Sequence, residues 1–317
     1  MRLVSLIASA TEIIHLLKLG SYQVGRSHEC DYPPEVERLP VCTAPRFPTN
    51  GSSRQIDLAV KEALKEAVSV YRVFDSLLKD LDPTHILTQT QCEVCAVSLR
   101  DVECALAERI DADMQLISLE AATLADVWTD ILKTAEALEV PKRGLRATES
   151  LQLRLSEISG RAQLADQRPS VACIEWIEPL MVAGNWVPEL VDLAGGRDLF
   201  GQAGLHSPYL SWNSLVEADP DIILIMPCGF SMNRSEQEMH WLTSKAEWSA
   251  MKAVRKEQVY LCEGNQYFNR PGPRLVESAQ IIAEILHPSL FQPRLEGTGW
   301  RRYIPTAAET TTLPSQV

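Results

Sequence analysis

The chain has 317 residues, which is long enough for two ordinary domains that each bury a core of their own. Hydrophobic residues make up 45% of the chain and charged residues 23%, a balance typical of globular proteins. The net charge is −12, and no cluster of Lys and Arg interrupts the acidic average, which argues against a nucleic-acid-binding protein.

The N-terminal residues bear on the cellular compartment. Met1 and Arg2 lead directly into a strand-like run, so we expect no secretory signal before the fold. No segment reaches the roughly 18 to 20 consecutive apolar residues that a membrane span needs. The sequence therefore predicts a cytoplasmic protein without membrane insertion. Its eight cysteines would then lie in a reducing compartment, where metal or thiol chemistry is more common than disulfides.

The first elements in chain order are a buried strand and a helix. The strand is predicted over residues 2–8. Ser9 and Glu12 have the spacing of a capping box, in which each side chain bonds to the backbone of the other residue at the start of a helix. A second strand is expected over residues 24–27. Residues 28–34 then form a loop, because two consecutive prolines exclude both helix interior and strand pairing.

The middle of the chain alternates between helices and strands. Residues 54–81 carry apolar side chains near helical spacing, which predicts one long amphipathic helix. Such alternation favours parallel sheets with helices on both faces. The elements predicted after this helix are strands at 85–88 and 115–119 and helices at 99–110 and 123–138.

A second long helix divides the chain. Pro141 suits a first helical position, and the helix is predicted to run to about residue 165, roughly 35 Å at 1.5 Å per residue. The predicted fold class is therefore α/β, with two Rossmann-like lobes of parallel sheet joined by a single long helix. The lobes are assigned to residues 1–140 and 169–303, the connecting helix to 141–168 and a disordered tail to 304–317. In the second lobe, strands are predicted at 171–174, 221–226 and 259–262 and the last helix at 273–287.

Four segments together resemble the cobalamin-binding members of the periplasmic binding proteins with a long interlobe helix, a group that captures vitamin B12, haem or iron-siderophores. They are SLIASATEII (5–14), VGRSHECDYPPEV (24–36), residues 170–200 and VYLCEGNQYFNRPGPRLVESAQIIAEIL (259–286). The resemblance implies a ligand held between the lobes, at the carboxyl ends of parallel strands, which agrees with the general rule for open α/β sheets.

The resemblance also implies which residues meet the ligand. Aromatic members of this set can lie flat against a macrocycle, and polar members can address its amide or carboxylate fringe. For Trp186, a position facing the ligand and a position in the core are equally open. The candidate ligand-binding residues are His28, Glu29, Cys30, Gln89, Gln91, Cys92, Trp176, Glu178, Trp186, Tyr209, Asn265, Gln266, Tyr267 and Phe268.

The resulting hypothesis is a binding protein, not an enzyme, for a cobalamin-like corrinoid or a related tetrapyrrole or metal complex. As a member without a secretion signal, it would store, transfer or sense its ligand in the cytoplasm. The alternative is a periplasmic-type binding component of an ABC importer. Its partners would be the small-molecule ligand and a membrane importer or a protein that accepts the ligand, with no nucleic acid.

A cysteine pair keeps a second hypothesis open. Cys92 and Cys95 have the C-x-x-C spacing of half a zinc site or of a redox pair. His28 and Cys30, on a neighbouring loop, can complete a set of four ligands for zinc or an iron–sulfur cluster. The same thiolates can instead contact the metal of a bound corrinoid or haem, or Cys92 can act on that ligand as an enzyme. Both cysteines can also simply be small buried residues. The four cysteines expected in the core are Cys42, Cys104, Cys173 and Cys262.

Overall fold

The computed structural model describes residues 1–65, 69–90 and 114–305, which divide into two compact units. The first unit consists of Met1–Arg154 and Arg270–Val276. The second consists of Leu155–Asn269 and the described part of Glu277–Val317. The domain boundaries given above stay a prediction, and the predicted tail lies largely outside the described residues.

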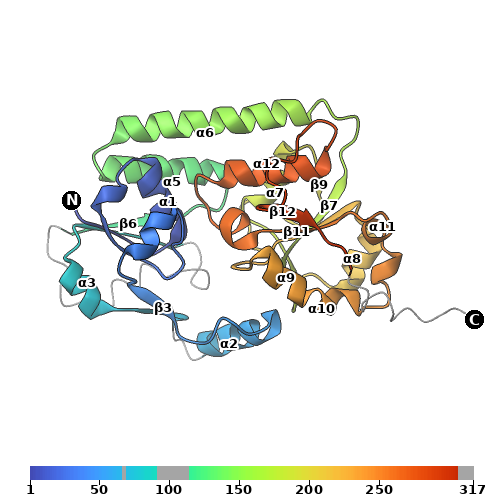
Figure 1. Ribbon diagram of the computed structural model, residues 1–317, viewed down its shortest axis with the longest axis horizontal. Coiled ribbons are helices and arrows are strands. Elements are labelled where there is room, and N and C mark those ends of the chain that lie inside the picture. The colour runs from blue at the N-terminus through green and yellow to red at the C-terminus, as the bar shows by residue number, and fades with distance from the viewer. Residues whose placement is uncertain (66–68, 91–113, 306–317) are drawn as a thin grey trace, which may run out of the picture. The chain divides into compact units, whose positions relative to one another are not determined.

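The first unit is built on a four-stranded parallel sheet with the order β2-β1-β5-β6 (Figure 1). Helix α1 follows β1, and helix α5 follows β6. A small core on this sheet includes Val4, Leu78 and Ile86, each fully buried. The strands are β1 (Leu3–Ser5), β2 (Gln23–Arg26), β5 (His85–Gln89) and β6 (Gln115–Leu119); the helices are α1 (Ala8–Leu16) and α5 (Leu124–Ala137), with short turns η1 (Gly20–Tyr22) and η2 (Pro34–Arg38).

The single helix predicted over residues 54–81 is wrong. The structure has helix α2 (Ser53–Lys65), strand β4 (Tyr71–Val73) and helix α3 (Asp75–Leu81) in this stretch. Strand β4 pairs antiparallel with β3 (Thr43–Pro45), a strand that the sequence reading missed. The apolar residues near β4 fit two patterns, because they recur at helical spacing and also alternate with polar residues as in a strand. Pairing with β3 favours the strand.

The capping box predicted at Ser9 and Glu12 is also wrong. Helix α1 begins at Ala8, so Ser9 lies inside its first turn, fully buried, and its hydroxyl has no hydrogen-bond partner in the described part of the chain. Glu12 bonds to an arginine from another part of the sequence, as described below. A capping box does occur at Thr123, whose hydroxyl accepts from the backbone of Asp126 at the start of α5.

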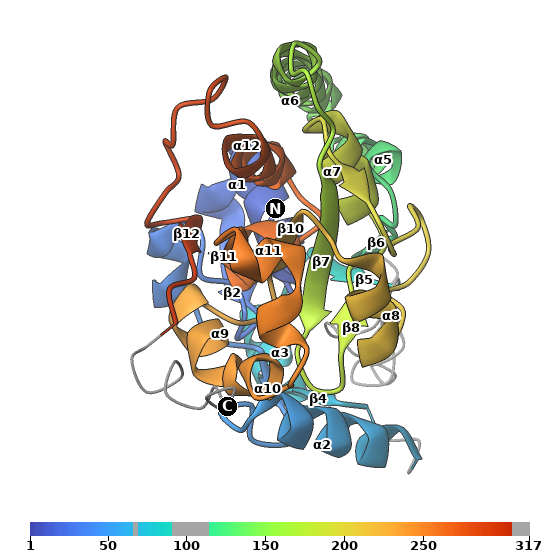
Figure 2. The same ribbon diagram turned by 90° about the vertical axis from the view of Figure 1, so that its right-hand side faces the viewer.

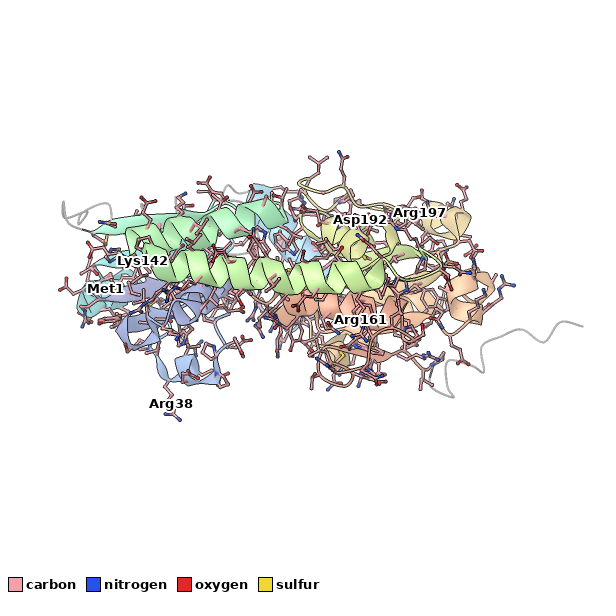
Figure 3. The ribbon with its side chains drawn as sticks, turned by 90° about the horizontal axis from the view of Figure 1, so that it is seen from above. Met1, Arg38, Lys142, Arg161, Asp192 and Arg197 are labelled. Atoms are coloured by element: carbon pink, nitrogen blue, oxygen red, sulfur yellow. The ribbon has the colours of Figure 1, made fainter. Side chains whose placement is uncertain are left out.

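The long helix predicted from Pro141 is confirmed as α6, Pro141–Ala162. Its buried residues Leu151, Leu155 and Ile158 recur at helical spacing and form its apolar face. Figure 3 looks onto the outer face of α6, with Lys142 near its first turn and Arg161 in its last. The guanidinium of Arg161 lies 5.3 Å from the ring centre of Phe291 in the second unit, to which this end of the helix belongs.

The second unit is built on a mixed sheet with the order β12-β11-β10-β7-β8, in which β9 also pairs with β7 (Figure 2). Pairs β7–β10, β10–β11 and β7–β9 are parallel, whereas β7–β8 and β11–β12 are antiparallel. The strands are β7 (Ser170–Trp176), β8 (Met181–Val182), β9 (Arg197–Asp198), β10 (Ile222–Ile225), β11 (Val259–Cys262) and β12 (Trp300–Arg302). The helices are α7 (Val187–Leu193), α8 (Trp212–Ala218), α9 (Met232–Glu238), α10 (His240–Thr243), α11 (Lys252–Arg255) and α12 (Leu275–Leu286), with η3 (Trp248–Ala250) and the turn η4 (Gly264–Phe268).

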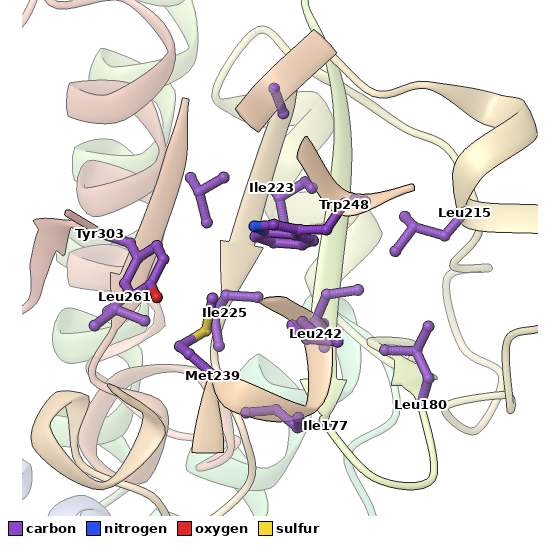
Figure 4. Packing of buried hydrophobic residues seen from close by; sticks show 14 of the residues in the cluster. Ile177, Leu180, Leu215, Ile223, Ile225, Met239, Leu242, Trp248, Leu261 and Tyr303 are labelled. Carbon is purple, nitrogen blue, oxygen red and sulfur yellow. The ribbon is translucent and has the colours of Figure 1, made fainter. Parts of the chain in front are cut away.

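A large hydrophobic core stabilises one face of this second sheet. The indole of Trp248 covers the strand residues Ile223 and Ile225, and Leu242 and Met239 close the cluster around it (Figure 4). Burial at about 25 cal/mol per Å² makes such side chains the main stabilising element of the unit. Trp248 is thus a packing residue. Cys42, Cys173 and Cys262 are buried as expected, and Cys104 lies outside the described residues.

The predicted fold class is confirmed: both units are α/β with parallel sheet, and a single long helix carries the chain from the first unit to the second. Besides the 54–81 stretch, the sequence analysis did not predict several short elements, among them strands β3, β9 and β12. In the described part of the chain, no helix combines the length and the apolar character needed to cross a bilayer.

Candidate ligand-binding residues at the strand ends

In the second unit, Trp176 ends strand β7 at its carboxyl end. Its ring is half-buried and lies against the ring of Phe230, with 5.2 Å between centroids and a tilt of 58°. The guanidinium of Arg234 in α9 lies 3.7 Å from the centre of the Phe230 ring. Trp176 therefore rests on a supported aromatic surface, which fixes the orientation of its own ring. Glu178, two residues beyond, is half-buried in the turn that leads to β8.

The turn η4 after strand β11 carries three further candidates. Asn265, Gln266 and Tyr267 are half-buried, so each has a side chain that a ligand can reach. Phe268 is different, because only 1% of its surface is exposed. Its assignment as a ligand-binding residue stays a prediction, and the burial of its ring favours a packing role in the core of the unit.

Trp186 is buried as well, and its role toward a ligand likewise stays a prediction. It is 5% exposed, and its indole N–H donates to the carbonyl oxygen of Phe268 at 2.9 Å. The core position left open by the sequence is therefore the one that the residue takes. Tyr209, in contrast, is 59% exposed, next to a backbone bridge with Met181, and stays a candidate.

In the first unit, His28 follows strand β2. Its Nδ1 lies 2.8 Å from the hydroxyl of Thr43, and that hydroxyl donates to Ser27 at 3.1 Å. Burial, together with the charge of Arg26, lowers the pKa of His28 to about 4, so the ring is neutral near pH 7.

Glu29, in the same loop, differs from Asp31 and Glu12, whose carboxylates each bond to an arginine side chain. Its side chain is 36% exposed, and its Oε1 lies 4.0 Å from Nε2 of His28. Desolvation raises the pKa of Glu29 to about 7, the positive charge of Arg270 opposes that rise, and Asp31 adds to it. Arg270 meets Glu29 through the backbone oxygen, at 3.2 Å, and not through the carboxylate.

The arginines near this loop are engaged by other carboxylates. Arg270 is 6% exposed and donates to both oxygens of Asp31, at 2.5 and 2.9 Å. Arg274 donates to Oε1 of Glu12 at 2.6 Å and stacks on the ring of Tyr32, with 4.1 Å to its centre. The sequence reading missed both arginines. Their signal is a pair of positive charges that flank Pro-Gly-Pro, just before an apolar helix.

The remaining first-unit candidates do not form a metal centre in the described residues. Cys30 is 1% exposed, its Sγ accepts from the hydroxyl of Thr11 at 3.0 Å, and burial raises the pKa of its thiol to about 11. No group of three His, Cys, Asp or Glu side chains in residues 1–65, 69–90 and 114–305 is placed to hold a metal ion. Gln89 is buried at the end of β5. Gln91, Cys92 and Cys95 lie outside the described residues, and their proposed roles stay predictions.

Comparisons with known proteins agree with this architecture. A sequence model described as periplasmic binding protein matches residues 3–265. The chain belongs to the periplasmic binding protein family. It is 22% identical over 289 residues to the vitamin B12-binding protein of Vibrio cholerae, covering 90% of this chain and 88% of that one. It is 22% identical over 298 residues to an uncharacterized ABC transporter substrate-binding lipoprotein of Bacillus subtilis, covering 92% and 81%.

Solved structures of this periplasmic binding protein family share the fold. The periplasmic haem-binding protein RhuT from Roseiflexus sp. RS-1 superposes with a TM-score of 0.67 at 20% identity, covering 91% of this chain and 98% of that one. The family resemblance inferred from the four sequence segments is therefore confirmed.

The predicted cytoplasmic location is wrong. The family to which the chain belongs is described as periplasmic, and the relatives include a substrate-binding lipoprotein and a periplasmic haem-binding protein. The prediction rested on the first residues of the chain, which form the buried strand β1 and report on the fold, not on the compartment.

Proposed function

We propose that this chain is a substrate-binding protein for a cobalamin-like corrinoid and that it delivers its ligand to an ABC-type membrane importer. The family membership and the vitamin B12-binding relative support a binding function. The substrate-binding lipoprotein among the relatives supports the importer as partner. Each unit presents candidate contact residues at the ends of its strands.

The observation that carries the choice of ligand is the charge of the exposed strand-end groups. Among the described candidates that remain half-buried or exposed, the polar groups are one neutral imidazole, one indole, two amides, two phenols and two carboxylates; these residues are His28, Glu29, Trp176, Glu178, Tyr209, Asn265, Gln266 and Tyr267. None of them is Lys or Arg. The guanidiniums of Arg270 and Arg274 are engaged by Asp31 and Glu12.

This set matches a ligand whose rim carries amides better than one whose rim carries carboxylates. Amide N–H groups donate to carboxylates, and amide oxygens accept from Asn and Gln side chains. A haem propionate near Glu178 in the second unit would instead meet a carboxylate, and juxtaposed like charges lower affinity. The aromatic rings of Trp176 and Tyr267 supply apolar area for the flat face of either macrocycle. A corrinoid with a neutral amide rim is therefore preferred over haem.

The test is a spectral titration of the purified protein with cyanocobalamin, dicyanocobinamide and haemin, together with calorimetry. We expect both corrinoids to bind and haemin to bind at least about tenfold more weakly. Trp176→Ala is expected to weaken corrinoid binding by about tenfold or more, because a central aromatic anchor is lost. Trp212→Ala is the matched control, since this indole packs on α8 against Trp248, with 6.4 Å between centroids. The absence of any spectral change or binding heat with either corrinoid would refute the proposal.

A further inference from the structure

The turn η4, Gly264–Phe268, is a single π-helical turn between strand β11 and helix α12. A π turn is a rare backbone conformation that occurs often at functional sites. Three of its residues, Asn265, Gln266 and Tyr267, belong to the candidate ligand-binding set. What holds the turn in this conformation therefore bears on how it presents these side chains.

Buried side chains from distant segments satisfy the carbonyl groups at the end of the turn. The indole N–H of Trp186, the residue that precedes α7, donates to the oxygen of Phe268 at 2.9 Å. The hydroxyl of Ser278 in α12 donates to the oxygen of Tyr267 in a short hydrogen bond. Ser278 is fully buried and Trp186 is 5% exposed. Water therefore has little access to replace either donor.

The start of the turn is fixed by Asn269 and by backbone contacts. The side-chain amide of Asn269 donates to the oxygen of Gly264 at 2.9 Å and to that of Met226 at 3.3 Å. The backbone N–H of Asn265 donates to the oxygen of Phe230 at 3.1 Å. A Cβ on Gly264 would lie 2.2 Å from the oxygen of Pro227, so only glycine allows this close approach to the loop after β10.

We infer that Trp186, Asn269 and Ser278 are positioning residues: they brace the π turn so that Asn265, Gln266 and Tyr267 meet the ligand from a prearranged backbone. Each bracing group acts on the backbone of the turn, not on the ligand. Rigid presentation lowers the ordering cost that binding must overcome, and supporting side chains decide how well a site is held. The consequence for ligand affinity rests on the proposed function, whereas the consequence for the turn itself does not.

The decisive variant is Trp186→Phe, which keeps an aromatic ring in the core and removes the N–H. Trp300→Phe is the matched control. Trp300, in strand β12 of the same unit, is also buried, at 7% exposure, and its indole donates to Glu284 of α12 at 2.8 Å. Both variants remove an indole N–H from a buried acceptor, although Oε2 of Glu284 still accepts from the backbone N–H of Leu295 at 3.1 Å. They differ in whether that acceptor belongs to the turn.

Two measurements are made on the full chain. Hydrogen exchange without ligand is expected to show about tenfold faster exchange of the amides of residues 264–269 in Trp186→Phe and wild-type exchange there in Trp300→Phe. Titration with dicyanocobinamide is expected to show about a tenfold higher Kd for Trp186→Phe and an unchanged Kd for Trp300→Phe. Ser278→Ala should behave as Trp186→Phe does. Its control is Ser235→Ala, which removes a fully buried hydroxyl that donates to Ser231 at 3.0 Å in α9.

The outcomes separate the two proposals. Unchanged exchange of the turn in Trp186→Phe and Ser278→Ala overturns the inference, as does an equal loss of affinity in Trp186→Phe and Trp300→Phe. If the wild-type chain binds neither corrinoid, the proposed function fails. The exchange of residues 264–269 then still decides whether these side chains brace the turn. Should Trp186→Phe fail to fold, Ser278→Ala and its control carry the same comparison.

Discussion

The Glu12→Gln substitution distinguishes sharply between a capped helix and a buried ion pair. In a capping box, Gln replaces Glu at little cost, because either side chain can accept from the backbone. In the structure, the side chain of Glu12 is 2% exposed, and its Oε1 lies 2.6 Å from Arg274 and 3.5 Å from Arg270. Neutralising it removes the negative charge that lies beside both arginines.

The magnitude follows from this geometry. Removing one partner of a buried pair costs about 3–5 kcal/mol in unfolding free energy. Because Arg270 keeps its two bonds to Asp31, we expect a loss of unfolding free energy at the lower end of this range, about 3 kcal/mol. Ser9→Ala tests the same two alternatives. If Ser9 capped the helix, the substitution would lower the free energy of unfolding by about 1 kcal/mol. Because its fully buried hydroxyl has no hydrogen-bond partner in the described part of the chain, we expect no loss.

The assay must report on the first unit alone, because a chain of two units need not unfold in one step. Trp128 in α5 is the one tryptophan of the first unit, and the other six belong to the second. Incorporation of 5-fluorotryptophan allows its ¹⁹F resonance to be followed through a urea titration. The double variant with Arg274→Met should recover part of the loss, because neither charge is then left alone. A Glu12→Gln midpoint equal to wild type, together with a destabilised Ser9→Ala, would refute the reasoning.

Three further predictions concern stability. Desolvation raises the pKa of Asp221, but bonds from Lys252 and Ser170 outweigh it and lower this pKa to about 2. The ionised carboxylate therefore stabilises the fold by at most about 2 kcal/mol. This stabilisation is present above the ordinary pKa of 3.8 and is lost as pH falls toward 2. Asp221→Asn should flatten acid unfolding in that window, and an unchanged profile would contradict this. Desolvation lowers the pKa of His28 from 6.5 to about 4, so stability should fall as pH drops through that range, and His28→Gln should remove this slope in a urea titration. Ile223→Ala, in the core of the second unit, should cost about 3 kcal/mol in calorimetry, whereas Leu164→Ala, at a position 72% exposed, should cost almost nothing.

Local patterns in the sequence determined the class of fold. The apolar runs of the buried strands and the apolar face of α6 are properties of adjacent residues, so they can be read without knowing what they pack against. Strand β11 occupies Val259–Cys262, the range that its sequence predicts, and α6 begins at Pro141. The strand-end loops follow from these elements, because ligands of open α/β sheets bind at the carboxyl ends.

Only the tertiary structure decided which side chains in those loops are available. Phe268 and Trp186 are aromatic residues in loops expected to face the ligand. In the structure the ring of Phe268 is buried, and the indole of Trp186 donates to the carbonyl oxygen of Phe268. Glu12 has the spacing of a cap, yet its partner Arg274 lies 262 residues away. Burial and ion pairing depend on residues that are distant in sequence and close in space, and neither periodicity nor local spacing carries that information.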